Sequence, residues 1–421
     1  MRRRFLLLAV VVAAFSLGTY AAETTVNTSE ELKTAVDAAA DGDVIVIGQA
    51  DTELVQTTLS IAKKITIKAA PGLSKKPMLK LGILLKNGGS VHLDGLKFYY
   101  DADGSETHSD SKYGIQAVTE VAAIDFIRIT NCEVSNLGRG LIRADNTTNI
   151  ATIGEVTIDN VTVKNVSSVN SGYATIGLKT AKVSKISITN STFVDALGGI
   201  VYSEEATMPF EFVMDKVTIY NCDLKGNKDV VGLSKAIEGS KLSISNTLMY
   251  FPKSVAAADT IVKGAINLSS TAVLSLTNSV IMSNQFPGKI NALIKPSPTN
   301  TAWTAYDVNT TVTEVVMGAD FKIEMLPARI TSVGDPRGHA GFTGLNDVKA
   351  GSMLVYPNPV VDRVMFDREY RHVEVLNLMG MRVAGATNVS ELGVQELHSG
   401  HYIVRATDAR GMQHVQKIIK K

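Results

Sequence analysis

One short phrase recurs through most of this chain: aliphatic or β-branched residues in alternation, followed by a turn residue. Its copies are ITIKA (65–69), VHLDG (91–95), IRITN (127–131), VTIDN (156–160), ISITN (186–190), VTIYN (217–221), LSISN (242–246) and LSLTN (274–278). Their last residues are separated by 26, 36, 29, 30, 31, 25 and 32 positions, a period of about 30. Strands so far apart in sequence cannot be hairpin neighbours, and one short strand per repeat of this length indicates a solenoid.

A second series of short strands has a similar period. It comprises YGIQAV (113–118), GLIRAD (140–145), ATIGLK (174–179), GIVYSE (199–204), VVGLSK (230–235) and AINLSS (265–270). Two series half a repeat apart indicate at least two strands in every coil of a parallel stack, whose rungs lie about 4.8 Å apart. An antiparallel sandwich with asparagine turns is the alternative, but sandwich turns usually come every 8–12 residues or so.

Asparagines close six of the phrases and predict a column along one corner of the coil: Asn131, Asn160, Asn190, Asn221, Asn246 and Asn278. Asparagine tolerates the left-handed backbone of a tight corner, and stacked side-chain amides can hydrogen-bond along the column. Aliphatic residues two positions earlier are expected to face inward: Ile129, Ile158, Ile188, Ile219, Ile244 and Leu276.

Two cysteines, Cys132 and Cys222, each follow a column asparagine. An exported protein with two cysteines suggests a disulfide. Equivalent positions three coils apart would, however, be separated by about 14 Å, whereas a disulfide requires Cα atoms within about 7 Å. We therefore expect two free, buried thiols.

The start of the repeat region suits a capped solenoid. Thr28 and Glu31 have the spacing of a capping box for a helix through Ala39, and DGDVIVIG (41–48) would begin the first coil. This stretch resembles the N-terminal cap of pectate-lyase-like right-handed β-helix proteins, and the asparagine column resembles the asparagine ladder of that superfamily. Residues 23–340 more narrowly resemble an uncharacterised Bacteroidetes β-helix family, whose last coil has a GDPR-type ending similar to VGDPRG (333–338). The predicted fold is an all-β, right-handed parallel β-helix over residues 22–340, with a short N-terminal capping helix.

The first 21 residues predict a secretory signal peptide. Arg2, Arg3 and Arg4 form a positive region, Phe5 to Leu17 is apolar, and small residues precede a cleavage site after Ala21. The apolar run is shorter than the roughly 20 residues of a membrane span, and no later segment is long and apolar enough to be one. We therefore expect an exported, soluble protein.

The chain ends in a segment of different character, residues 352–421, after a predicted linker at 341–351. Short strands divided by glycine turns suit a small Ig-like β-sandwich. The segment resembles the C-terminal sorting domain of the type IX secretion system through these residues: Tyr356, Pro357, Asn358, Pro359, Gly380, Gly400, Tyr402, Lys417, Lys420 and Lys421. The resemblance implies export to the outer-membrane surface or medium via the periplasm, with the secretion machinery and a sortase-like peptidase as partners, and attachment to surface lipopolysaccharide.

Candidate site residues come from the outward positions of the second strand series: Gln116, Arg143, Asp145, Lys179, Tyr202, Glu204 and Asn267. Arginine can bind a carboxylate through two hydrogen bonds, and Tyr202 offers a face for a sugar ring. In a catalytic interpretation Arg143 or Lys179 would be the base, and Asp145 or Glu204 its partner. A solvated face with charges paired between rungs is the alternative.

Other chemistry has little support in the sequence. The net charge of +1 does not indicate a nucleic-acid partner. DADGSETHSD (101–110) resembles the start of a calcium loop at Asp101 and Asp103, but it lacks the closing bidentate Glu, so we expect no resident cofactor. In the superfamily that the chain resembles, lyases use clustered acidic calcium ligands with an Arg or Lys base, and hydrolases use Asn-Thr-Asp, Asp-Asp, His-Gly and Arg-Ile-Lys phrases. Residues 90–290 contain none of these phrases.

The sequence therefore predicts a secreted or cell-surface β-helix protein that is non-catalytic, either structural or glycan-binding. The second hypothesis is a polysaccharide lyase or glycoside hydrolase acting on uronic glycans.

Overall fold

The computed structural model of the 421-residue chain describes these residues: 21–99, 113–166, 173–222, 229–251, 264–269, 271–283, 294–295, 301–309, 316–317, 323–325, 333–338, 355–377, 382–408 and 413–421. The chain divides into two compact units, residues 1–340 and 341–421. The expected signal residues 1–20, the linker, Asp101, Asp103 and Gly380 lie outside the described residues.

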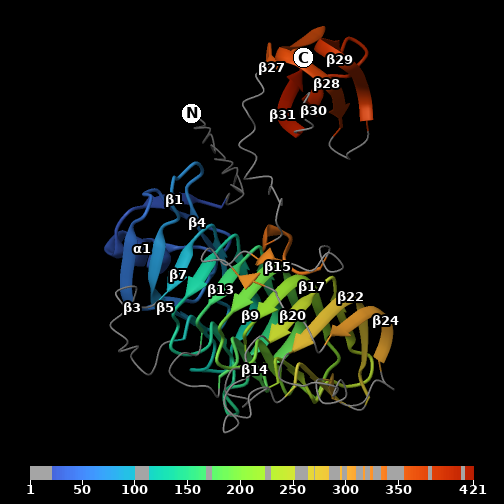
Figure 1. Cartoon of the computed structure of the whole chain (residues 1–421). Helices are drawn as coiled ribbons and strands as arrows, with labels where there is room; N and C mark the ends of the chain where they lie inside the picture. Colours follow the sequence, from blue (N-terminus) through green and yellow to red (C-terminus); the bar gives the residue numbers. More distant parts are fainter. Residues whose placement is uncertain are drawn as a thin grey trace, which may run out of the picture. The chain divides into compact units, whose positions relative to one another are not determined.

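The first unit is a parallel β-helix, in which each strand pairs with its equivalents one coil before and one coil after (Figure 1). The described strands form three faces. The first face contains all copies of the recurring phrase except VTIYN. Its strands are β1 (Glu23–Val26), β2 (Val44–Ile47), β4 (Lys64–Ala69), β6 (Ser90–Asp94), β9 (Ala123–Thr130), β12 (Thr152–Asp159), β19 (Lys241–Ser245) and the first parts of β15 (Lys182–Val194), β17 (Glu211–Tyr220), β22 (Val273–Ser283) and β24 (Thr301–Asn309).

The second face follows the corner. It contains β7 (Lys97–Tyr99), β10 (Glu133–Ser135), β13 (Thr162–Lys164), β20 (Leu248–Phe251) and the second parts of β15, β17, β22 and β24. The third face contains β8 (Ile115–Gln116), β11 (Ile142–Arg143), β14 (Ile176–Lys179), β16 (Val201–Ser203), β18 (Val231–Leu233), β21 (Ile266–Leu268) and β23 (Ile294–Lys295). In the N-terminal coils, β3 (Glu53–Ile61) and β5 (Met78–Leu85) run through both of these faces.

The inward side chains of the three faces form one continuous apolar core. On the first face, Ile129, Ile158, Ile188, Ile244 and Leu276 are buried at the positions expected from the phrase. Because every rung buries a similar aliphatic residue above the one below, each coil is stabilised mainly by its two neighbours.

Helix α1 (Ser29–Ala38) covers the N-terminal end of the coil stack, as predicted. The Thr28 hydroxyl accepts from the Glu31 amide at 3.2 Å, and the Glu31 carboxylate accepts from the Thr28 amide at 3.2 Å. This capping box fixes the start of the helix. Leu32 and Val36 are buried on its inner side, so the helix shields the first coil from water.

The corner between the first and second faces has left-handed backbone at Asn131, Asn160, Asn190, Asn246 and Asn278, with φ between 41° and 57°. Asn160 donates its amide to Asn131 Oδ1 at 2.5 Å, and Asn278 donates to Asn246 Oδ1 at 2.6 Å. The other three donate to aspartates of the preceding coil: Asp94, Asp159 and Asp215. The side chains therefore satisfy polar groups along the corner while the backbone turns.

Asn221 does not belong to this column, which corrects the alignment of VTIYN with the other phrases. Asp215 of β17 lies opposite Thr189 and Ser245, which puts Lys216 at the first corner with φ 56°. Asn221 lies at the next corner, where its amide donates to Asp195 Oδ1 at 2.5 Å. The expected inward position of Ile219 is taken by Met214, and Ile219 is buried on the second face.

Both cysteines are buried thiols, and they form no disulfide with each other. Cys132 follows the first corner and Cys222 follows the second, so the two cysteines do not occupy equivalent positions, contrary to the sequence-based expectation. Burial raises the pKa of the Cys132 thiol to about 12. A thiol with so high a pKa is a poor nucleophile, so this residue is part of the core rather than of a reactive site.

Residues Val333–Gly338, here called the return segment, run back across coils in the middle of the second face instead of adding a coil after β24. Its 3-10 turn η3 (Pro336–Gly338) follows Asp335, which is buried and accepts from the Thr192 hydroxyl at 2.7 Å. Arg337 binds both Asp335 oxygens and donates to the Val161 carbonyl at 3.0 Å. The return segment thus binds consecutive coils that lie far from it in the sequence.

The second unit is a small antiparallel structure with its own core. Its strands are β27 (Val355–Tyr356), β28 (Arg363–Leu376), β29 (Arg382–Gly393), β30 (Gly400–Thr407) and β31 (Gln413–Lys420), in the order β27, β28, β30, β31, with β29 also on β28. The remaining described strands, β25 (Val316–Met317) and β26 (Ile323–Met325), form a separate antiparallel pair in the first unit.

The Tyr-Pro-Asn-Pro motif holds the last strand of the second unit. Asn358 donates its amide to the Lys417 carbonyl at 3.0 Å and accepts from the Ile419 amide at 2.9 Å. The Lys421 amide donates to the Val360 carbonyl at 2.9 Å. The basic end of the chain is therefore ordered by the motif at the start of the unit, although Lys420 itself is buried.

Candidate functional site

The third face brings several of the predicted site residues into one outward row. In this row the register places Arg143 opposite Gln116 on one side and Gly177 on the other. The row continues through Tyr202 and a second glycine to Asn267. Because the glycines have no side chains, Arg143 and Tyr202 are separated by an empty position.

A cavity of about 420 Å³ opens at this empty position, here called the third-face cavity. Its lining is Tyr113, Ile142, Arg143, Asp145, Tyr173, Ala174, Gly177, Lys179, Tyr202 and Glu204. Five of the seven predicted residues therefore line one cavity. Gln116 and Asn267 lie outside this lining, and Asn267 donates its amide to Asp229 at 2.7 Å.

The acidic residues of the cavity are bound to neighbouring side chains. Asp145 accepts from Arg143 Nε at 2.6 Å, and Glu204 accepts from the Tyr202 hydroxyl. Burial, followed by the hydrogen bond to Glu204, raises the pKa of Tyr202, so the phenol is a poor general base at neutral pH. Asp145 and Glu204 follow β11 and β16, strands that are two rungs apart, roughly 10 Å along the stack.

Two tyrosines that the sequence search missed form the other side of the cavity. The rings of Tyr113 and Tyr173 meet edge to face at 5.4 Å between centroids. Arg143 stacks on Tyr113 at 4.6 Å, and Arg139 lies over Tyr173 at 5.0 Å. The sequence does contain a signal for this pair: Tyr113 and Tyr173 come two and three residues before their third-face strands. An alignment of the residues that precede these strands places the two tyrosines together.

Two buried polar atoms in this cluster lack a hydrogen-bond partner within the described part of the chain. They are the Tyr113 hydroxyl and Arg139 Nε. A buried donor left unpaired costs about 1–3 kcal/mol, so an acceptor supplied by a ligand would stabilise this cluster. Burial raises the pKa of Tyr113, which keeps its hydroxyl protonated and able to donate.

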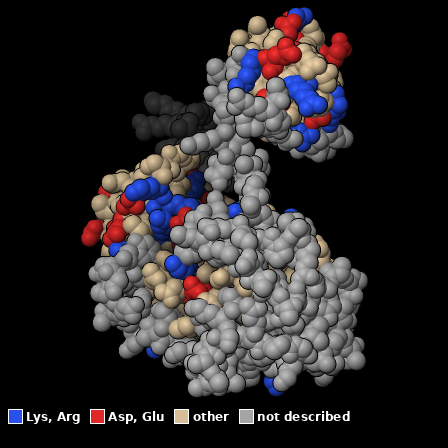
Figure 2. All heavy atoms as spheres, in the orientation of Figure 1, with Lys and Arg blue, Asp and Glu red and all other residues tan. Residues whose placement is uncertain are grey.

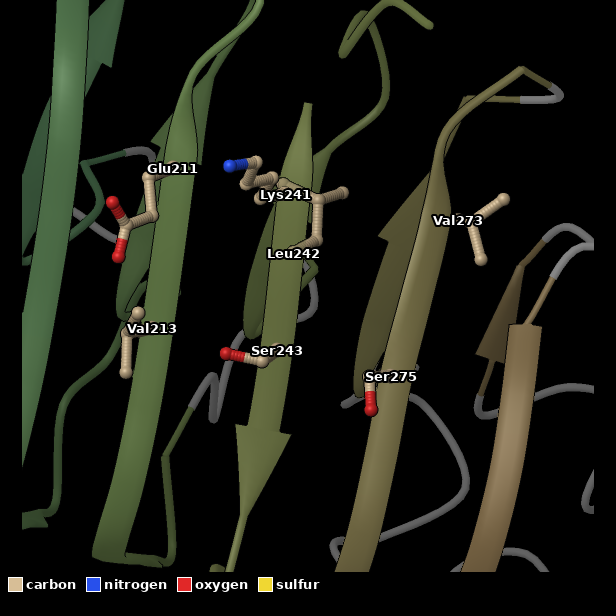
Figure 3. A pocket seen from close by; sticks show the side chains of 7 residues that line it. All are labelled: Glu211, Val213, Lys241, Leu242, Ser243, Val273 and Ser275. Carbon is tan, nitrogen blue, oxygen red and sulfur yellow. The ribbon is translucent and has the colours of Figure 1, made fainter. Parts of the chain in front are cut away.

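A second hollow lies on the first face and is shallower, about 240 Å³. Figure 3 shows that its side chains come from three successive strands: Glu211 and Val213 from β17, Lys241, Leu242 and Ser243 from β19, and Val273 and Ser275 from β22. Its lining contains no aromatic ring, and Glu211 pairs with Lys185 at 3.1 Å. This hollow is better explained as a groove between rungs of a solvated sheet.

Charges on the N-terminal coils also pair with one another. Lys and Arg are interspersed with Asp and Glu there in Figure 2. Lys68 pairs with Glu23 at 3.0 Å, and Lys80 pairs with Glu53 at 2.8 Å. This surface therefore has the mixed charge of a solvated face rather than a one-signed binding patch.

The described residues provide neither a metal cluster nor a membrane-spanning helix. These contain no group of three or more His, Cys, Asp or Glu side chains suited to a metal ion, and the candidate calcium loop lies outside them. No helix among them is long and apolar enough to cross a bilayer.

Two parts of the chain match two different known families. Residues 354–421 match the family described as "Secretion system C-terminal sorting domain", and residues 53–196 match the "Domain of unknown function (DUF4957)". No curated protein matches the chain. The sorting domain shows that the protein is exported through the type IX secretion machinery and is secreted or held at the cell surface.

The similar solved structures include a PL6 family alginate lyase, AlyGC, and an arginine mutant of the same enzyme. Identity is 15% and 16%, with TM-scores of 0.38 and 0.36, and each match covers 69% of this chain. The match spans 39% of the length of each lyase chain. We therefore take the β-helix from the strand pairing itself and no activity from this likeness.

Proposed function

We propose that this protein is a secreted or surface-held glycan-binding β-helix, with the third-face cavity as its binding site. The single observation that carries the proposal is the gathering of Arg143, Lys179 and Tyr202 around one cavity of about 420 Å³. Charged donors and acceptors beside aromatic rings suit a sugar, whose faces are partly apolar and whose rim carries hydroxyl groups.

The hydrogen bonds that the acidic residues already accept favour binding over catalysis. Asp145 and Glu204 each already accept a hydrogen bond from a neighbouring side chain. A general base must be free to take a proton from the substrate, whereas a binding site benefits from side chains held in fixed positions. Held in this way, Arg143 and Tyr202 are preorganised to contact a ligand.

A lyase or hydrolase acting on uronic glycans is the second candidate. The observation that favours it is Lys179, which lines the same cavity. Lys179 has no acidic partner among the described residues. A base in β-elimination must likewise be free of an ion pair. Lys179 also sits at a register shift of β14 with φ 43°, an unusual backbone that holds its side chain at the cavity.

The sorting domain adds a second part to the proposal. Removal of the second unit by a sortase-like peptidase, with attachment of the first unit to surface lipopolysaccharide, would present the third-face cavity outside the cell. The family match supports passage through the secretion machinery, and the later steps rest on the resemblance alone.

The test is a glycan-array screen followed by titration calorimetry with purified protein. Tyr202→Ala and Lys179→Ala are expected to weaken binding by roughly tenfold, because each removes a cavity contact. Lys241→Ala, a lysine of the first-face hollow, is the matched control and should bind as wild type. Equal loss in all three variants, or binding to no glycan, would refute the proposal.

The same samples decide between binding and catalysis. Release of unsaturated or reducing sugar ends by the wild type, abolished in Lys179→Ala, would replace the binding proposal by the enzymatic one. Binding without any such release is the expected result.

A further inference from the structure

The Tyr113–Arg139 corner of the third-face cavity offers hydrogen-bond donors without acceptors. Tyr113 is 2% exposed, and its hydroxyl makes no hydrogen bond of ordinary geometry in the described structure, although the Arg139 and Tyr173 side chains lie beside it. Arg139 Nε is equally shielded and equally unpaired. The rings of Tyr113 and Tyr173 line the cavity, and Arg139 lies directly behind them in contact with both rings, outside the lining itself.

Two cations of the cluster also lack a counter-ion among the described residues. Arg143 Nε forms an ion pair with Asp145 Oδ1 at 2.6 Å, and Glu204 accepts a hydrogen bond from the Tyr202 hydroxyl. Arg139 and Lys179 have no acidic partner among the described residues. Elsewhere on the first unit, by contrast, cations such as Lys68 and Arg128 are paired with carboxylates of other rungs.

We propose that this corner receives an oxyanion substituent of the bound glycan, a carboxylate or a sulfate ester. The inference rests on the glycan-binding function proposed above and adds the chemical class of the ligand. Tyr113 and Arg139 would each donate to the oxyanion, and Arg143 would lie beside it as a second cation.

An oxyanion fits these donors better than a neutral hydroxyl does. A carboxylate or sulfate has only acceptor atoms, which complement a phenol O–H and a guanidinium N–H, and hydrogen bonds to ionised groups are stronger than neutral ones. Arginine also supplies a planar fork that suits both groups. A neutral sugar hydroxyl would leave the charge of Arg139 without a counter-ion.

Entry of the oxyanion requires a side-chain movement, since both donor atoms are covered in the unliganded protein. Arg143 is the side chain placed to allow it. Its side chain is 32% exposed, lines the cavity and stacks on the Tyr113 ring, so a rotation of Arg143 would open a path without moving the β-helix backbone.

The test compares ligands on one sugar backbone, in neutral, uronic and sulfated forms, with inorganic sulfate as a separate probe. Calorimetry gives affinities, and NMR of arginine Nε–H groups reports contact directly. The full chain is used as wild type, Arg139→Gln and Tyr113→Phe, with thermal melts to show that each variant is folded. Arg128→Gln is the matched control, because Arg128 is on the first face and pairs with Glu155.

Wild type is expected to bind the uronic or the sulfated form at least about tenfold more tightly than the neutral form. Arg139→Gln and Tyr113→Phe should remove that preference by weakening binding of the charged form more than binding of the neutral form, and Arg128→Gln should retain it. Whichever charged ligand binds more tightly, the uronic or the sulfated one, identifies the substituent as a carboxylate or a sulfate ester.

Equal affinity for neutral and charged forms would overturn the oxyanion site while leaving glycan binding intact. If sulfate shifts the Arg139 Nε–H signal but none of the glycans binds, the oxyanion site is supported and the proposed glycan-binding function is overturned. Charged-ligand affinity that is unchanged in both Arg139→Gln and Tyr113→Phe would also overturn the oxyanion site.

Discussion

The corner asparagines act at the scale of single residues. At Asn160 the backbone has φ 57°, and the side-chain amide binds the asparagine of the preceding coil. The side chain therefore does two things: it makes a left-handed conformation tolerable, and it satisfies a polar group at a corner where the strand hydrogen bonds are interrupted.

Asn160→Ala should lower the free energy of unfolding by about 2 kcal/mol, about 1 from the lost amide bond and about 1 from the left-handed backbone. Asn160→Gly is the matched control, because glycine adopts the conformation freely and loses only the bond, about 1 kcal/mol. Denaturant midpoints measure the difference. Equal destabilisation by alanine and glycine would show that backbone strain does not matter at this corner.

The site shows which residues a sequence pattern can find. Arg143, Lys179 and Tyr202 were found because they occupy outward positions of recognisable strands. Tyr113 and Tyr173 lie just outside those strands, where a residue's direction depends on how the chain enters the rung. Only the structure shows that their rings contact each other and two arginines.

At the scale of elements, the return segment is the clearest case of tertiary structure that the repeat does not indicate. Its Asp335 hydrogen-bonds to Thr192, which is 143 residues earlier in the chain. Gly334 has φ +87°, and a Cβ there would lie 2.5 Å from Thr218 Oγ1, so the close approach requires glycine. Such a contact has no period and cannot be read from spacing.

Asp335→Ala is expected to destabilise the first unit by about 3 kcal/mol, the lower end for a broken buried pair, because Arg337 remains 28% exposed. Asp125→Ala removes a surface partner of Lys64 and is the control, with an expected loss below about 1 kcal/mol. Denaturant unfolding followed by circular dichroism compares them. Similar losses in both variants would mean that the return segment does not stabilise the coils.

At the scale of the whole molecule, the chain joins a unit that could bind ligand to a unit that directs export. Each has its own apolar core. The sorting motif acts within its own unit, where Asn358 holds the last strand, so the export signal is a folded structure and not only a basic tail.

Deletion of residues 352–421 should leave the first unit folded but abolish delivery to the cell surface, with the protein retained in the periplasm. Cell fractionation and surface protease digestion would measure this. The same residues fused to an unrelated periplasmic protein provide the complementary control and should carry it to the surface. Normal delivery of the truncated chain would contradict the role assigned to the sorting domain.

The sequence by itself determined the parallel β-helix, its capping helix, five of the six corner asparagines and the export domain, because each depends on local patterns or on one repeating period. It misplaced Asn221, since the phrases on either side of a corner have the same alternation and a period cannot tell one face from the next. Tertiary structure alone decided the Tyr113–Arg139 cluster and the return segment. Both arise where residues without a shared period pack together, and their partners are set by the closing of the coils rather than by sequence spacing.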